Sequence, residues 1–182
     1  MRLIVGITGA SGLIYAERLL RVLSGTEHSA DVIVSARARL VNEQECGMDF
    51  TSFGFPVHDN DSAAVPSLSG SRPYDACVVV PCSMATLGRI ASGVADTAIA
   101  RTADVFLKER RPLILVVRES PYSLIHIRNM ARVTLAGATV LPASPAFYTR
   151  PDTIEALADT IVARVLDHLG VAHSLAPPWS PP

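Results

Sequence analysis

The stretch that decides the fold runs from residue 75 to residue 121: DACVVVPCSMATLGRIASGVADTAIARTADVFLKERRPLILVVRESP. Two of its segments, residues 76–80 and 113–117, are almost entirely apolar, as parallel strands covered on both faces should be. The residues between them favour helices. Polar residues follow each apolar segment at once, and in open α/β sheets the carboxyl ends of the strands are where ligands bind. This stretch therefore predicts an α/β domain and is the first candidate for its active site.

Three further apolar runs, at residues 3–7, 31–35 and 139–141, extend the same pattern along the chain. Helix-like segments alternate with these runs, the first beginning near Ser11 and the last covering residues 153–169. Five strands alternating with helices predict a doubly wound parallel sheet of the α/β class, in a single domain over residues 1–170. The Pro-rich tail over residues 171–182 is expected to be extended or disordered.

Composition excludes several classes of protein. The 182 residues are 49% hydrophobic, enough for one core, and the formal net charge of −1 argues against a nucleic-acid partner. The sequence shows neither a signal-peptide pattern nor an apolar run of membrane-spanning length, so we expect a soluble, cytoplasmic protein. The three cysteines lack CxxC spacing and the five histidines form no ligand motif, so neither a disulfide framework nor a metal site is expected.

Residues 46–73 form a long stretch rich in Gly, Pro, Ser and Asp with little periodicity. Compact domains rarely keep so long a connection without a use. We expect it to be either a lid or a subunit contact.

The turn GITGASG at residues 6–12 joins the first strand to the first helix. Glycines let a backbone approach a ligand, and the N–H groups at a helix start attract an anion, with Thr8 and Ser11 adding hydroxyls. The GxxGxxG spacing and the end of the second strand at Ser35, where an acidic residue would bind ribose, both disfavour NAD. The alternative is a tight strand–helix turn without a ligand.

The two strands of the deciding stretch end in different polar groups. Ser83 and Thr86 follow the first, and Arg118 with Glu119 follow the second, where Ser120 suits an N-cap and Pro121 a first helical position. Glu119 is a candidate general acid or base, beside an arginine that either fixes its charge state or binds an anion. The alternative is a salt bridge that caps the sheet edge.

Cations gather on the helix predicted around residues 98–110. Arg101, Asp104 and Lys108 share one face, which either presents two cations to a phosphate or forms the helical ion pairs Arg101–Asp104 and Asp104–Lys108. A phenol and a guanidinium are also able to share a phosphate, but the sequence spacing of Tyr148 and Arg164 does not reveal whether they meet.

Several motifs, taken together and in order, resemble the flavin prenyltransferases, the UbiX-type family. They are GITGASGLIYAERLL, SGSRPYDACVVVPCSMATLGRIASG, RTADVFLKERRPLILVVRESP, IHIRNM, GATVLPASPAFYTRP and RVLDHLG. The resemblance implies a Rossmann-like or flavodoxin-like domain that binds FMN, usually as a homododecamer with active sites at subunit junctions. It also implies an enzyme that transfers a dimethylallyl group from dimethylallyl monophosphate to N5 and C6 of reduced FMN. The prenylated FMN would then serve a partner decarboxylase of the ubiquinone-pathway type, or one that breaks down aromatic acids.

The resemblance assigns roles to individual residues of this sequence. The implied FMN-binding set is Gly9, Ala10, Ser11, Ser35, Ser83, Met84, Ala85, Thr86 and Arg118. The implied prenyl-phosphate set, in part from a neighbouring subunit, is Arg101, Lys108, Tyr148 and Arg164. The implied catalytic set is Ser11 near N5, Glu119 as the acid/base group that assists departure of phosphate, and the further carboxylate Glu45. Trp179 resembles an aromatic found near the site in some relatives, and Thr102 stands where alanine is usual.

Two other functions compete with this interpretation. Flavin-dependent cysteine decarboxylases also bind FMN at subunit junctions, but their PASANT and PAMN motifs are not evident here. A non-catalytic FMN carrier is the second alternative. The magnesium-binding DDxxD motif of many prenyltransferases is likewise missing from the sequence, and a cation cluster suits a metal-free monophosphate leaving group.

Overall fold

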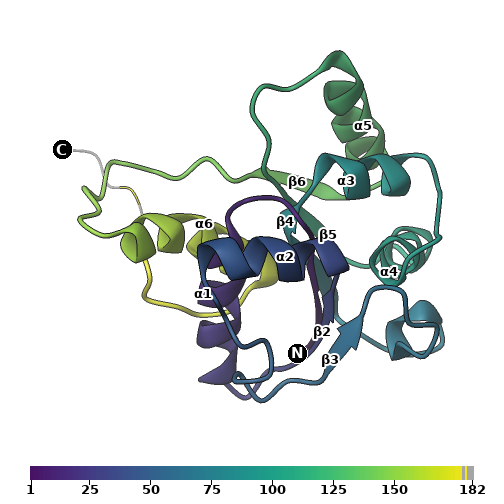
Figure 1. Ribbon diagram of the computed structural model, residues 1–182, viewed down its shortest axis with the longest axis horizontal. Helices are drawn as coiled ribbons and strands as arrows, with labels where there is room; N and C mark the ends of the chain where they lie inside the picture. The colour runs from purple at the N-terminus through teal and green to yellow at the C-terminus, as the bar shows by residue number, and fades with distance from the viewer. Residues whose placement is uncertain (178, 180–182) are drawn as a thin grey trace.

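A parallel sheet of six strands, in the order β3-β2-β1-β4-β5-β6, forms the centre of the molecule (Figure 1). The computed structural model describes residues 1–177 and 179. The strands are β1 (Arg2–Ile7), β2 (Ser29–Val34), β3 (Val57–Asp59), β4 (Ala76–Cys82), β5 (Leu113–Val117) and β6 (Thr139–Pro142). The helices are α1 (Leu13–Ser24), α2 (Ala36–Glu45), α3 (Met84–Ala91), α4 (Ala98–Lys108), α5 (Leu124–Leu135) and α6 (Ile154–Leu169), with a short 3-10 helix η1 (Pro66–Leu68).

The central strands are apolar throughout because each one feeds two hydrophobic cores. In β1, Leu3, Val5 and Ile7 belong to one core, whereas Ile4 between them belongs to the other. The same alternation continues in β4 and β5. Successive side chains of a strand point to opposite faces of the sheet, so a sheet covered on both faces needs apolar residues at every position.

The helices form a layer on each face of the sheet. The first core includes residues of α1, α2 and α6, and the second includes residues of α3, α4 and α5. In Figure 1 helices α1, α2 and α6 lie to the left of the sheet and helices α3, α4 and α5 to its right, with the end of α5 projecting at the top. This is the doubly wound α/β domain that the sequence predicts, and its strand order is that of the Rossmann fold.

The structure corrects the expected elements in two places. A sixth strand, β3, lies inside the stretch 46–73, where only Val57 of its three residues is apolar and no strand was expected. The helix after β5 starts at Leu124 with Ser123 as its N-cap, not at Pro121 with Ser120. Ser123 is the better N-cap because it forms a capping box. Its hydroxyl accepts a hydrogen bond from the N–H of His126, and the His126 ring accepts one from the N–H of Ser123.

Buried hydrogen bonds fix the stretch 46–73 to the rest of the domain. The carboxylate of Asp31, in β2, accepts hydrogen bonds from His58 and from Tyr74, which lies just beyond the end of the stretch. The Ser67 hydroxyl of η1 meets the Thr102 hydroxyl of α4 at 2.7 Å, and both side chains are buried. The stretch is therefore fastened to the sheet and to α4 within a single chain.

The C-terminal segment returns along α6. Val171 is buried and its N–H donates to the carbonyl of Leu166. Leu175 packs against the first core. The expectation of an extended or disordered tail falls partly on residues 178 and 180–182, which lie outside the described residues.

Candidate active site

The order of the strands reverses between β1 and β4, and the carboxyl ends of these two strands are joined by Thr8. Its hydroxyl donates to the carbonyl of Pro81 at 2.7 Å and accepts from the N–H of Ser83 at 2.8 Å. Thr8 is only 2% exposed. The hydroxyl that the sequence offered as a sign of ligand binding therefore holds the two strand ends in place instead.

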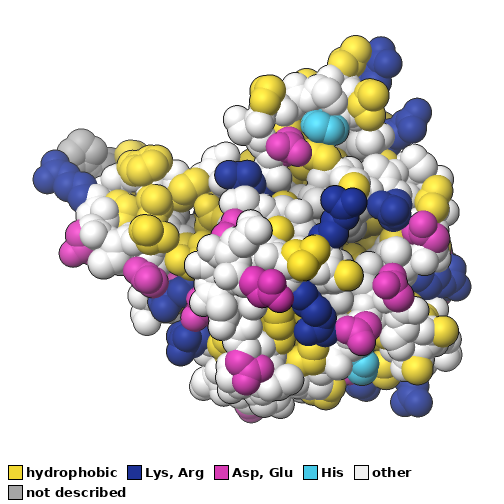
Figure 2. All heavy atoms as spheres, viewed as in Figure 1, with side chains coloured by type: hydrophobic (Ala, Val, Ile, Leu, Met, Phe, Trp, Pro, Cys, Tyr) yellow, Lys and Arg dark blue, Asp and Glu magenta, His cyan; other side chains and the backbone are white. Residues whose placement is uncertain are grey.

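A cavity of about 410 Å³ opens at this reversal point, where Rossmann folds bind their ligands. Of the residues singled out from the sequence, it is lined by Gly9, Ser35, Ser83, Ala85 and Thr86. Thr8, also singled out, lines it as well. Six further lining residues were not singled out from the sequence, namely Ala36, Arg37, Asn60, Asp61, Arg89 and Thr97. Figure 2 shows Lys and Arg side chains gathered over the region where α2, α3 and α4 converge.

Two helix N-termini present free N–H groups to this cavity. Ser35 caps α2 by accepting from the N–H of Ala38, and Ser83 caps α3 by accepting from the N–H of Thr86. Among the described residues, the first two N–H groups of each helix have no hydrogen-bond partner. Such groups, together with the positive end of the helix dipole, form an anion-binding site.

The N-terminus of α4 is closed. Asn60 accepts from the N–H of Ala98 through its carbonyl and from the N–H of Ile99 through its side chain. Thr97 accepts from the N–H of Ala100. Only α2 and α3 therefore offer unpaired helix-start N–H groups among the helices that line this cavity.

The N-terminus of α1 is also closed, by the carboxylate of Glu45. Its Oε2 accepts from the N–H groups of Gly12 and Leu13 at 2.8 and 2.9 Å. The sequence predicted that this glycine turn faces an anion; that anion is a side chain of the protein itself, from the end of α2.

The surroundings of Glu45 favour its charged form. Partial burial would raise the pKa of its carboxyl, but hydrogen bonds from the Ser11 hydroxyl and from the N–H groups of Leu13 and Gly12 outweigh this, and the charge of Arg118 adds to them. The pKa of Glu45 therefore lies below its ordinary value. Burial raises the pKa of the Tyr15 phenol, and the charge of the same Arg118 opposes this rise in part. Ser11 and Arg118 thus both act on the Glu45 carboxylate.

Gly9 is needed for packing beside the cavity. A Cβ at this position would lie 2.4 Å from the Cβ and 2.9 Å from the carbonyl carbon of Arg37. The glycine turn and the start of α2 therefore approach too closely for any side chain at this position.

The cations of α4 are paired with carboxylates on the same helix or next to it. Arg101 contacts Asp104 at 2.7 Å, but Lys108 pairs with Glu109 and not with Asp104, so the second expected ion pair is wrong. Asp104 is already paired with Arg101, and Glu109 is the C-cap residue at which the helix ends. Arg101 lines a hollow of about 200 Å³ that shares Asn60, Asp61 and Thr97 with the main cavity.

Arg118 and Glu119 stand exposed at the carboxyl end of β5. One oxygen of Glu119 accepts from the N–H of Ser120. Within residues 1–177 and 179 the Arg118–Glu119 salt bridge considered from the sequence does not form. The Glu119 carboxylate is therefore accessible to a ligand.

Tyr148 and Arg164 share a hollow, but it lies in a different place. They line a hollow of about 670 Å³ between α6 and the C-terminal segment, together with Trp179. This hollow shares no lining residue with the cavity at the strand ends. One chain therefore does not bring Tyr148 and Arg164 together with Arg101.

The described residues contain neither a membrane-spanning helix nor a metal-binding cluster. No helix in this part of the chain is long and apolar enough to cross a membrane. No group of three His, Cys, Asp or Glu residues there is arranged to hold a metal ion.

Known proteins resemble this chain over nearly its whole length. Residues 1–166 match the family described as Flavoprotein. The chain is 43% identical to the flavin prenyltransferase UbiX of Methanocaldococcus jannaschii, over 98% of each protein. It matches the crystal structure of a dodecameric FMN-dependent UbiX-like decarboxylase from Escherichia coli O157:H7 with a TM-score of 0.96, at 38% identity over 100% of both chains.

A further match is the crystal structure of AnUbiX (PadA1) in complex with FMN and dimethylallyl pyrophosphate. The TM-score is again 0.96, at 40% identity over 99% of this chain and 97% of that one. Sequence identity at this level over full length, joined to the same fold, establishes common membership. The chain belongs to the flavin prenyltransferase UbiX family.

Proposed function

We propose that this protein transfers a dimethylallyl group from dimethylallyl monophosphate to N5 and C6 of reduced FMN, and that a partner decarboxylase uses the product. The observation that carries the proposal is the pair of open helix N-termini, α2 and α3, facing one cavity at the reversal point of the sheet. Family membership supports it, as does the AnUbiX structure, which contains FMN and dimethylallyl pyrophosphate. The alternative donor is dimethylallyl diphosphate.

The cavity at the strand ends would hold FMN. The free N–H groups of α2 and α3 suit its phosphate, and Arg37 and Arg89 line the same space. The hydroxyls of Ser35 and Ser83 are already used as N-caps, so their contribution is to keep those N–H groups in place. The glycine turn over residues 9–11 and Arg118 complete the proposed set around the ring system.

The prenyl phosphate would be held by Arg101 and Lys108 with Tyr148 and Arg164. Because the first and last of these line separate hollows in one chain, we propose that a second copy supplies the missing residues. The UbiX-like protein of Escherichia coli is dodecameric, and we propose the same assembly here. Cations fixed around a leaving phosphate neutralise the charge that develops on it, so we propose that no metal is required.

The remaining residues have distinct proposed roles. Glu119, exposed at the end of β5, would give or take a proton at the departing phosphate. Ser11 would lie near N5, and Glu45, bonded to Gly12 and Leu13, would hold the turn that carries Ser11.

The decisive experiment measures the mass of the flavin after anaerobic incubation of the purified protein with reduced FMN and dimethylallyl monophosphate, with and without EDTA. The expected result is a gain of one prenyl unit in both conditions. Glu119→Gln should bind FMN as the wild type does yet leave it unmodified. Glu27→Gln, which changes another exposed glutamate, is the matched control and should prenylate normally.

Each contrary outcome points elsewhere. Tightly bound but unmodified FMN with the wild type would favour the carrier or the cysteine decarboxylase. Loss of turnover with EDTA alone would refute only the metal-free step. Normal prenylation by Glu119→Gln would remove Glu119 from the mechanism.

A further inference from the structure

The last turn of α6 carries a carboxylate that contacts two different partners. Asp167 accepts from Nη1 of Arg164 at 2.5 Å through one oxygen, and from Nε2 of His173 at 3.0 Å through the other. Neither Asp167 nor His173 was assigned a role from the sequence. All three side chains line the 670 Å³ hollow that also contains Tyr148 and Trp179.

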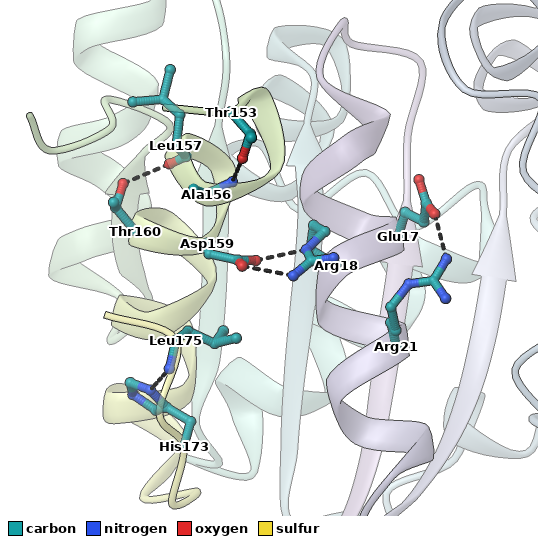
Figure 3. Close-up of polar contacts among 10 residues, drawn as sticks. All are labelled: Glu17, Arg18, Arg21, Thr153, Ala156, Leu157, Asp159, Thr160, His173 and Leu175. Carbon is teal, nitrogen blue, oxygen red and sulfur yellow. Dashed lines mark hydrogen bonds and ion pairs between the residues drawn. The ribbon is translucent and has the colours of Figure 1, made fainter. Parts of the chain in front are cut away.

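His173 fixes Asp167 to the segment beyond the helix. Its side chain is only 10% exposed, and its Nδ1 accepts from the N–H of Leu175 at 3.4 Å, drawn in Figure 3. With a proton on Nε2, the neutral imidazole satisfies both of its nitrogens at once. The orientation of the Asp167 carboxylate is thereby set by a chain of contacts that runs from Leu175 to Arg164.

The ion pair between Arg18 and Asp159, also on α6, differs from the pair between Arg164 and Asp167 in how many guanidinium nitrogens are bonded. Asp159 accepts from Nε and Nη2 of Arg18 at 2.7 and 2.6 Å, so the two groups face each other across α1 and α6 with both oxygens engaged (Figure 3). Asp167 takes only Nη1 of Arg164. Among the described residues, Nε and Nη2 of Arg164 have no partner, which leaves them for an anion.

We infer that Asp167 is a positioning residue: it orients the Arg164 guanidinium toward the prenyl phosphate, and His173 sets the direction of its carboxylate. The inference rests on the proposed function, in which Arg164 binds that phosphate. A guanidinium on a flexible stem loses side-chain freedom when it binds an anion. Holding it in place beforehand reduces that loss and improves affinity without touching the reacting atoms.

The test measures kcat and KM for dimethylallyl monophosphate with the full-length protein and reduced FMN. Asp167→Ala should raise KM about tenfold and change kcat by less than about twofold, as expected when binding alone is impaired. Asp167→Asn, which keeps the shape but not the charge, should raise KM as well. Glu17→Gln is the matched control, since Glu17 forms a helical pair with Arg21 outside the hollow (Figure 3).

A double variant separates positioning from a general structural effect. In the Arg164→Ala background, Asp167→Ala should cause no further rise in KM, because the guanidinium that it orients is gone. An unchanged KM in both single variants, or the same rise with and without Arg164, would overturn the inference.

Calorimetric titration of the protein loaded with oxidised FMN measures the affinity for dimethylallyl monophosphate without turnover. Weaker binding by Asp167→Ala than by the wild type supports the positioning role even if the wild type transfers no prenyl group. In that case only the proposed reaction fails. Equal binding by the two proteins, or no binding by the wild type, would refute the role of Asp167.

Discussion

The cavity at the strand ends and the hollow on α6 are built in different ways. The cavity at the strand ends is bounded by helix starts and by buried hydrogen bonds, such as those made by Thr8 and Asn60. The hollow on α6 is lined in part by exposed side chains, among them Tyr148 and Arg164. Figure 2 shows hydrophobic side chains gathered in the region of α6. The first gathers five of the nine proposed FMN-binding residues within one chain, whereas the second holds only part of the proposed phosphate site. Substitutions in the cavity at the strand ends should therefore lower both the free energy of unfolding and the affinity for FMN. Substitutions in the hollow on α6 should weaken only the binding of dimethylallyl monophosphate.

The strongest test of this contrast is Gly9→Ala. The added Cβ would meet backbone of Arg37 at 2.9 Å, so α2 must shift. We expect a loss of about 3 kcal/mol in the free energy of unfolding, as for overpacked sites, measured by urea denaturation. FMN affinity, measured by quenching of flavin fluorescence, should fall at least about tenfold because the N-terminus of α2 moves with the helix.

Gly25→Ala provides the control for Gly9→Ala. Its added Cβ would meet only the carbonyl oxygen of Val22, at an ordinary 3.5 Å. It should leave FMN binding unchanged. If Gly9→Ala kept full FMN affinity, the cavity would not depend on the close approach of the turn and α2.

The buried hydroxyl pair beside Arg101 allows a sharper measurement. Thr102→Val removes one hydroxyl and leaves that of Ser67 without its partner, which should cost about 1–2 kcal/mol in the free energy of unfolding. Adding Ser67→Ala should recover most of that loss, because no buried polar group then remains unpaired. A double variant as unstable as the sum of the two single ones would show that the pair contributes no net coupling.

The sequence predicted the parts of the fold that long apolar runs determine. Strands β1, β2, β4 and β5 were expected because each feeds both cores, but β3 was missed because its three residues gain their place only by pairing with β2. The same reasoning singled out Ser83, since the carboxyl ends of parallel strands share one edge, whereas the family resemblance assigned Ser35 to the site.

Contacts between distant parts of the chain could not be predicted from the pattern. Glu45 meets the glycine turn across more than 30 residues of sequence, and Asn60 reaches α4 only because β3 exists. Arg37 and Arg89 reach the cavity through the placement of α2 and α3. The family resemblance supplied Glu45, but only the structure reveals what its carboxylate contacts.

The pH dependence of stability tests the internal anion. Because the pKa of Glu45 is lowered from its ordinary value of 4.5 on folding, its stabilising effect is fully present above that pH and is lost as the pH falls through the lower, folded-state value. The difference in the free energy of unfolding between the wild type and Glu45→Gln should therefore become smaller as the pH is lowered. Denaturant unfolding curves recorded between neutral pH and pH about 3 measure this difference. Glu43→Gln, on the same helix, is the control for the loss of a negative charge. A gap that stays constant over this range would mean that the carboxylate does not hold the turn.

The smallest expected effect lies in the hollow on α6. Arg164 is exposed and pairs with Asp167 three residues along the helix, and such surface pairs contribute about 0.2–0.5 kcal/mol. Arg164→Ala should therefore leave the denaturation midpoint almost unchanged while KM for dimethylallyl monophosphate rises. A substantial loss in the free energy of unfolding would mean that Arg164 supports the fold of α6. The hollow on α6 would then contribute to stability as the cavity at the strand ends does, and the contrast between the two would be wrong.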